Sequence, residues 1–158
     1  MEIEYLIIFL PLLGAFISGF FGNLIGSRNS EIITSSFVSI SAIFSFLIFY
    51  KVLNENYINN LNIFTWISSG SLNASWSIKI DALSSVMLVV VTLVSSLVHI
   101  YSIGYMSHDP HKQRFMSYLS LFTFSMLILV TSDNFLQLFF GWEGVGLCSY
   151  FLIGFWFK

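Results

Sequence analysis

Apolar residues dominate five stretches of the chain, at 5–26, 32–53, 82–105, 115–131 and 135–157. Each stretch is close to the roughly 20 residues that an α-helix needs to cross the hydrocarbon region of a bilayer. Short polar segments such as 27–31 and 107–114 separate them. The pattern predicts an all-α membrane protein with five transmembrane helices, surrounded by the lipid bilayer.

One long connection, over residues 54–80, joins the second apolar stretch to the third and is rich in Asn and Ser. Its segments 61–67 and 72–80 partly alternate between apolar and polar residues, on either side of Ser68-Ser69-Gly70-Ser71. Alternation around a turn that contains glycine is typical of a β-hairpin. We therefore expect a short hairpin at the membrane surface between helices two and three.

Acidic residues stand just before three of the predicted helices. Asp81, Asp109 and Asp133 each precede an apolar stretch, and Pro110 follows Asp109 directly. Aspartate is favoured at the N-cap and proline at the first helical position. The sequence therefore predicts that all three aspartates cap helices.

Composition supports a membrane protein and excludes several other classes. The chain of 158 residues is 56% hydrophobic and 9% charged, against about a quarter charged residues in soluble domains. The net charge of −2, without a basic cluster, argues against a nucleic-acid partner. The single cysteine excludes an intrachain disulfide and a metal site made of cysteines alone.

Basic residues in the loops predict the orientation of the chain, because cytoplasmic loops carry more Lys and Arg. With the N-terminus outside, four basic residues fall on the inner side and two on the outer side. The inner set is Arg28, Lys112, Arg114 and Lys158, and the outer set is Lys51 and Lys79. We therefore expect the N-terminus on the outer side, and we interpret the first helix as retained rather than cleaved.

Small residues line one face of the first predicted helix. Gly14, Ser18, Gly22 and Gly26 follow one another at intervals of four. This spacing lets a second helix approach closely. We interpret the face as a packing surface rather than an ion pathway, and we interpret the serines of helices two and three as interhelical hydrogen-bonding groups.

Glu143 is the residue that demands a chemical explanation. As the ninth residue of the fifth predicted helix, it lies about 12 Å from the helix start, near the middle of the membrane. An ionised carboxylate there costs about 2.5–3.5 kcal/mol or more. The acid must therefore be neutral, paired with a cation, or beside water inside the bundle. Gly141, Gly144 and Gly146 leave room around it for a partner helix or water.

Two interpretations of Glu143 remain open from the residues alone. It is a candidate for proton transfer or for an electrostatic switch, because intramembrane acids are functional by default. Alternatively, it is a protonated acid that only bonds a neighbouring helix.

Other polar residues favour structural roles. We interpret His99 as a hydrogen-bonded structural histidine rather than a proton carrier, and Cys148 as a small buried residue. His108, Asp109 and His111 lie together in a loop, but no fourth ligand is nearby, so capping is favoured over zinc binding. No residue constellation suggests nucleophilic catalysis.

Three segments resemble chain 5 (subunit L) of respiratory complex I, the proton-pumping NADH:quinone oxidoreductase. The run 138-LFFGWEGVGLCSYFLIGFW-156 resembles the signature helix of that family. The runs 78-IKIDALSSVMLVVVTLVSSLVHIYSIGYM-106 and 114-RFMSYLSLFTFSMLILVTSDN-134 are similar to its third and fourth helices. The resemblance covers residues 60–158 well, whereas helices one and two match only in character.

The resemblance implies an antiporter-like subunit of the membrane arm, with the other membrane-arm subunits as partners. Glu143 then corresponds to the acid of a proton channel and faces a lysine on a later helix. The chain itself would hold no cofactor, since NADH, FMN, the Fe–S clusters and quinone bind in partner subunits. The location would be the bacterial plasma membrane or the mitochondrial inner membrane.

Members of this family run to several hundred residues. We therefore expect the sequence to be the N-terminal part of such a subunit, with the later lysine in the C-terminal part that is missing. Two alternatives are the N-terminal piece of a multisubunit cation/proton antiporter, which usually differs after Trp142-Glu143, and an inactive five-helix remnant.

Overall fold

The computed structural model of the chain describes residues 3–55, 57–70 and 72–156. It contains five helices of sufficient length and hydropathy to cross a membrane. They are α1 (Ile3–Ile25), α2 (Ser27–Glu55), α3 (Ala82–Tyr105), α4 (Lys112–Val130) and α5 (Phe135–Ile153). The predicted fold class is confirmed, and the chain is an integral membrane protein.

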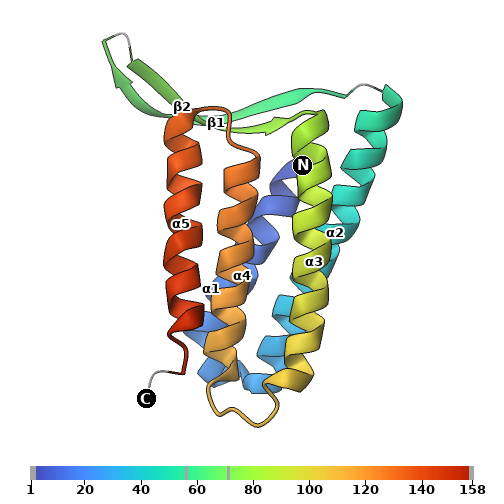
Figure 1. The fold of residues 1–158 in the computed structure, drawn as a ribbon, viewed down its shortest axis with the longest axis vertical. Coiled ribbons are helices and arrows are strands. Elements are labelled where there is room, and N and C mark those ends of the chain that lie inside the picture. The colour runs from blue at the N-terminus through green and yellow to red at the C-terminus, as the bar shows by residue number, and fades with distance from the viewer. Residues whose placement is uncertain (1–2, 56, 71, 157–158) are drawn as a thin grey trace.

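The predicted hairpin lies between α2 and α3 and is longer than expected. Its strands, β1 (Asn59–Ser69) and β2 (Leu72–Ile80), pair antiparallel. Gly70 has a φ of 58°, in the left-handed region that glycine adopts without steric cost. The hairpin crosses one end of the helix bundle, above the first turns of α5 (Figure 1).

Two helix boundaries differ clearly from the prediction. Helix α2 begins at Ser27 rather than residue 32, because Gly26, with φ 88°, turns the chain directly from α1 into α2. Helix α5 ends at Ile153, where Gly154 follows, and not at residue 157. Phe157 itself lies outside the described residues.

One of the three predicted N-caps is correct. Asp81 accepts a hydrogen bond from the backbone N–H of Ser84 at 2.8 Å, and the hydroxyl of Ser84 accepts from the N–H of Asp81 at 2.7 Å. The prediction for Asp133 is wrong by one residue. Asn134 caps α5 instead and accepts from the N–H of Gln137 at 3.0 Å.

The predicted cap at Asp109 is also wrong, because one of its oxygens bonds within the loop and the other bonds a distant residue. One oxygen accepts from the N–H of His111 at 2.7 Å, and the other accepts from the indole of Trp156 at 2.8 Å. Helix α4 therefore begins at Lys112, and Pro110 stays outside it.

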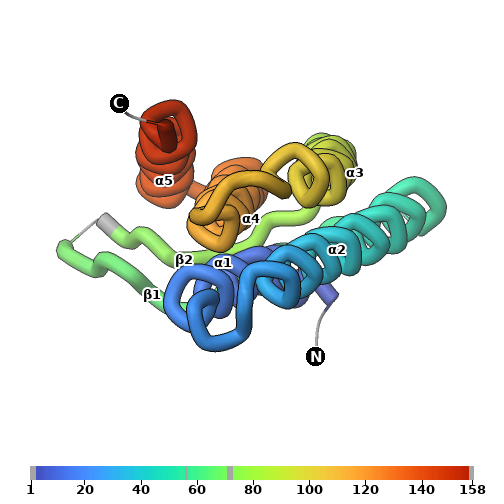
Figure 2. The backbone as a smooth tube through the Cα atoms, turned by 90° about the horizontal axis from the view of Figure 1, so that it is seen from below, coloured from blue at the N-terminus to red at the C-terminus, as the bar shows by residue number. Residues whose placement is uncertain are grey.

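Four helices form the body of the molecule, and α5 stands at its edge. Helix α1 packs against α2 and α4, and α2 packs against α3. Helix α5 packs against α4 (Figure 2). One side of α5 is therefore left without a neighbouring helix.

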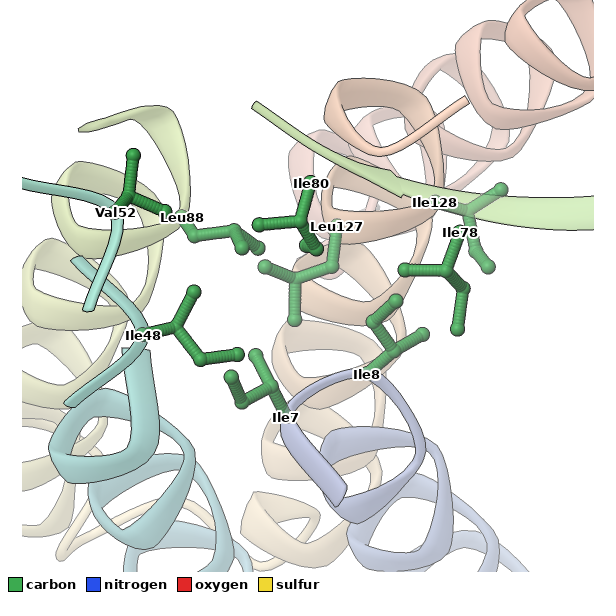
Figure 3. Packing of buried hydrophobic residues seen from close by; sticks show 9 residues of the cluster. All are labelled: Ile7, Ile8, Ile48, Val52, Ile78, Ile80, Leu88, Leu127 and Ile128. Atoms are coloured by element: carbon green, nitrogen blue, oxygen red, sulfur yellow. The ribbon is translucent and has the colours of Figure 1, made fainter. Parts of the chain in front are cut away.

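An apolar cluster fills the end of the bundle beneath the hairpin (Figure 3). The side chains come from all of the helices except α5, and from β2. They are Ile7, Ile8, Ile48, Val52, Ile78, Ile80, Leu88, Leu127 and Ile128. Close dispersion contacts of this kind hold membrane helices together, since lipid tails are as apolar as the side chains. The cluster joins the hairpin to the body.

The small-residue face of α1 packs as predicted. A Cβ atom at Gly14 would lie 3.6 Å from the backbone of Thr34 in α2, and one at Gly22 would lie 3.0 Å from Gln113 in α4. Ser18 bonds the carbonyl of Gln113 at 2.8 Å. The face serves helix packing, whereas Gly26 serves the turn.

Hydroxyl groups bridge α2 and α3 in the same way. The hydroxyls of Ser45 and Thr92 lie 2.6 Å apart, and both residues are buried. We expect Ser45→Ala and Thr92→Val to couple by about 0.6–1.7 kcal/mol in a double-mutant cycle of unfolding in detergent. As a control, Ser45→Ala should add without coupling to Ser117→Ala, which lies in another contact. Additivity of the first pair would contradict the bridge.

Candidate functional site

Helix α5 carries the candidate acid, and a glycine in it allows the helix to pack closely against α4. A Cβ atom at Gly141 would lie 2.8 Å from the backbone N and Cα of Leu129. Only glycine therefore permits this approach of the two helices. Gly144 packs similarly near the hydroxyl of Ser125. These two glycines thus serve the α4 side of the helix.

Glu143 lies on the opposite, exposed side of α5, as the ninth of 19 residues. Its carboxylate makes no hydrogen bond or ion pair with any residue that the structure describes. Large apolar side chains share its exposure, namely Leu136, Phe139, Trp142, Leu147, Tyr150 and Ile153. The sequence predicted an acid that is neutral, paired with a cation or beside water inside the bundle; within these five helices Glu143 faces outward.

Gly146 is the glycine nearest to Glu143 on the open side. A Cβ atom there would meet nothing within 4 Å. Of Gly141, Gly144 and Gly146, only Gly146 lies on the open side, where the absence of a side chain leaves space beside the acid. The face of α5 around Glu143 can therefore accept a closely packed neighbour.

The described lysines all lie away from Glu143. Lys79 pairs with Asp133 at 3.6 Å, and Lys112 pairs with Glu31 at 3.3 Å. The ammonium group of Lys51 lies 5.9 Å from the ring centre of Tyr57. Lys158, counted in the predicted inner set, lies outside the described residues. Among residues 3–156 as described, no lysine neutralises Glu143.

His99 is hydrogen-bonded, as predicted, and it is buried between α3 and α4. Its Nδ1 lies 2.8 Å from the carbonyl oxygen of Ser95, so Nδ1 carries the proton and donates. Its Nε2 lies 3.0 Å from the hydroxyl of Ser120 and accepts. Both ring nitrogens are therefore satisfied in the neutral form.

The loop with His108, Asp109 and His111 shows no metal-binding geometry. Within the described part of the chain, no group of three or more His, Cys, Asp or Glu side chains could hold a metal ion. Two hydrogen bonds lower the pKa of Asp109 below its usual value. The bond from the indole of Trp156 has the larger effect, and the bond from the backbone N–H of His111 has the next largest. Asp109 thus accepts a hydrogen bond that joins this loop to the segment just after α5.

Two buried polar contacts were not predicted from the sequence. Glu31, assigned to a polar turn, is 3% exposed and pairs with Lys112 across the α2–α4 contact. Gln137, within the fifth apolar stretch, is 0% exposed and bonds the hairpin. A polar residue inside a membrane helix is itself a signal, because its groups need a protein partner. That signal could have identified Gln137.

Residues 66–116 match the family described as NADH-Ubiquinone oxidoreductase (complex I), chain 5 N-terminus. This segment covers most of the hairpin, all of α3 and the start of α4. The match thus contains the whole of the run 78–106, and only the first residues, 114–116, of the run 114–134.

Relatives extend the similarity to nearly the whole chain. NADH-ubiquinone oxidoreductase chain 5 of Arabidopsis thaliana is 60% identical over 152 residues, which is 96% of this chain and 23% of that protein. The chain 5 protein of Trichophyton rubrum is 58% identical over 151 residues, again 96% and 23%. NADH-quinone oxidoreductase subunit L of Rickettsia bellii is 53% identical over 157 residues, or 99% and 24%.

Helices α1 and α2 are included in these matches, so the expectation that they resemble the family only in character is wrong. The chain spans about a quarter of the length of the curated relatives that it matches. Over nearly its whole length, the chain corresponds to the N-terminal part of NADH-ubiquinone oxidoreductase chain 5, which is also named subunit L.

Proposed function

We propose that this chain works in the membrane arm of a proton-pumping NADH:quinone oxidoreductase and contributes to proton translocation coupled to quinone reduction. The observation that carries the proposal is a carboxylate, Glu143, at the middle of a membrane helix and on its open side. Placing an ionised carboxylate in the lipid at the middle of the bilayer costs about 2.5–3.5 kcal/mol or more. Protein must therefore cover this face of α5 in the assembled complex.

The covering protein comes from the part of the subunit that the relatives possess beyond this segment, together with the other membrane-arm subunits. We propose that it brings a lysine to Glu143. A cation beside the carboxylate stabilises the ionised form, and its withdrawal favours uptake of a proton. Glu143 can then take up and release a proton as the cation moves, which is the requirement for an electrostatic switch.

Electron transfer belongs to the partner subunits in this proposal. They bind NADH, FMN, the Fe–S clusters and quinone, while this chain supplies no cofactor site. The names chain 5 and subunit L, which the relatives carry, favour this role over that of a cation/proton antiporter.

We propose that the N-terminus faces the outer side, periplasmic or intermembrane, of the bacterial plasma or mitochondrial inner membrane. The start of α1 and the hairpin share one end of the bundle (Figure 1). That end carries Lys51 and Lys79, whereas the other end carries Arg28, Lys112 and Arg114. The excess of basic residues at the second end favours its placement on the inner side.

Substitution of Glu143 by glutamine in the full-length subunit tests the proposal. Glutamine keeps the shape and hydrogen bonding of a protonated acid but cannot exchange a proton. We expect proton translocation per NADH oxidised to fall by about tenfold or more, since acid–base groups contribute roughly 10²–10⁴ in rate. Proton uptake by proteoliposomes that contain the purified complex measures this ratio, and the amount of assembled complex should stay near wild type.

Two variants serve as controls for this experiment. Glu143→Asp keeps a carboxyl group and should retain part of the pumping. Glu55→Gln makes the same chemical change at an exposed position in the last turn of α2 and should pump as the wild type does. Wild-type pumping by Glu143→Gln would reject the proposed role of this acid.

A further inference from the structure

The side chain of Gln137 joins the first turn of α5 to the hairpin, with the pair of hydrogen bonds that a neighbouring β-strand would make. The amide nitrogen of Gln137 donates to the carbonyl oxygen of Ser77 at 2.7 Å, and its amide oxygen accepts from the N–H of Ser77 at 3.1 Å. Both main-chain groups of Ser77 on the free edge of β2 are thereby satisfied. Because Gln137 is completely buried, loss of either bond would leave a buried polar group without a partner, which is unfavourable.

Neighbouring bonds continue this attachment along β2 into the α4–α5 turn. The side chain of Asn134 donates to the carbonyl of Ser75 at 2.6 Å, and the N–H of Lys79 donates to the carbonyl of Thr131 at 2.9 Å. The ammonium group of Lys79 also pairs with Asp133 at 3.6 Å. Bonds at three alternate positions of β2, 75, 77 and 79, fix the strand against the turn and the start of α5.

Aromatic side chains extend the contact one turn further down α5. The ring of Phe140 meets that of Trp76 edge to face, with ring centres 4.9 Å apart, and lies 6.2 Å from the ring of Trp66. Trp66 and Trp76 come from opposite strands of the hairpin. The hairpin therefore contacts α5 at Asn134, Gln137 and Phe140, in the turns just before Glu143.

The hairpin and α4 together define where Glu143 lies. Helix α5 runs unbroken from Phe135 to Ile153, so Gln137 and Glu143 belong to one rigid rod. Gly141 lies close against the backbone of Leu129 in α4, while Gln137 holds the N-terminal end of α5 to the hairpin. Loss of the Gln137 contact would remove one of the restraints on rotation and sliding of α5 against α4, and any such movement would displace Glu143.

We propose that Gln137 is a positioning residue, which couples the hairpin to Glu143 through its paired hydrogen bonds to Ser77. The proposal rests on the proposed function of Glu143. The hairpin and the acid then move as one unit, and a displacement of the hairpin shifts the carboxylate relative to its cation.

The test compares Gln137 variants in the full-length subunit within the purified complex. Gln137→Met keeps the length of the side chain but removes both bonds. We expect proton translocation per NADH oxidised to fall by about tenfold, since a misplacement of about 1 Å can cost roughly 100-fold. The measurement is made per assembled complex, so that a lower yield does not count as lower pumping. Gln113→Met, the same change at the other end of the bundle, should leave the ratio unchanged.

A second variant, Gln137→Glu, provides a signature that a purely structural role does not produce. A protonated carboxyl group has one donor and one acceptor, as the amide has, whereas a carboxylate only accepts. Pumping by assembled Gln137→Glu, relative to wild type at the same pH, should be near normal at acidic pH and fall at alkaline pH. Gln137→Met should show no such recovery. If Gln137→Met does not assemble, the pH profile of Gln137→Glu decides alone.

The outcomes separate this proposal from the one on which it rests. Normal pumping by Glu143→Gln would remove the proposed function and the coupling together. If Glu143→Gln loses pumping, but assembled Gln137→Met pumps at the wild-type ratio or Gln137→Glu follows the wild-type pH profile, only the positioning role of Gln137 is overturned.

Discussion

Leucine in place of Gly141 is expected to separate α5 from α4 and to prevent the chain from accumulating in folded form. The first atom of the new side chain would already lie 2.8 Å from the backbone N and Cα of Leu129. Backbone atoms cannot move aside as a flexible side chain does, so the whole helix must shift. The destabilisation should reach or exceed the upper end of the ~1–3 kcal/mol typical of overpacked cores.

Thermal unfolding and size-exclusion profiles of the chain in detergent would measure this effect. Gly146→Leu is the matched control, because it places the same residue on the same helix at a position with open space. We expect the control to unfold close to the parent temperature and Gly141→Leu to be recovered in low yield or aggregated. Equal stability of the two variants would show that α5 does not depend on the Gly141 contact.

Methionine in place of Lys112 is expected to be the second severe substitution. It leaves the carboxylate of Glu31, which is 3% exposed, without the cation that lies 3.3 Å away. Removal of one partner from a buried ion pair costs about 3–5 kcal/mol, since an uncompensated charge remains. The contact joins α2 to α4, so the loss should lower the stability of the whole bundle.

The neutral double variant distinguishes charge burial from loss of packing. Glu31→Gln combined with Lys112→Met should recover most of the stability that Lys112→Met alone loses. Lys79→Met serves as the control, because the Lys79 side chain is 46% exposed and its pair with Asp133 is longer, at 3.6 Å. Exposed pairs contribute about 0–1 kcal/mol. A double variant as unstable as Lys112→Met would contradict the charge explanation.

Much of the fold could be predicted because membrane helices and hairpins depend on local patterns. The apolar stretches identified all five helices, and the alternation around Gly70 identified the hairpin. The capping role of Asp81 was also evident, since it depends only on Ser84, three residues later.

The failed predictions involve contacts between residues far apart in the chain. Asp109 has the sequence context of a cap, but Trp156 takes one of its oxygens. Asp133 likewise pairs with Lys79 of the hairpin, and the neighbouring Asn134 caps α5 instead. Sequence alone does not reveal such competing partners.

The sequence identifies the residue of the candidate site, but it does not show on which side of α5 that residue lies. An acid within an apolar helix singled out Glu143 from the sequence. The direction in which Glu143 faces depends on which glycines contact α4. The sequence does not distinguish Gly141 and Gly144, which contact α4, from Gly146, which does not. The packing of Gly141 against Leu129 and of Gly144 near Ser125 shows that the acid lies on the other side.

The attachment of α5 to β2 also has a consequence for the order in which the protein is built. The ribosome makes the hairpin before α4 and α5, so the main-chain groups of Ser75 and Ser77 emerge before Asn134 and Gln137 exist to bond them. The edge of β2 is completed only when the fifth helix has entered the membrane and docked. Insertion of the helix that carries Glu143 is therefore the event that closes the hairpin edge, and the hairpin provides a template that selects the correct depth and rotation for that helix.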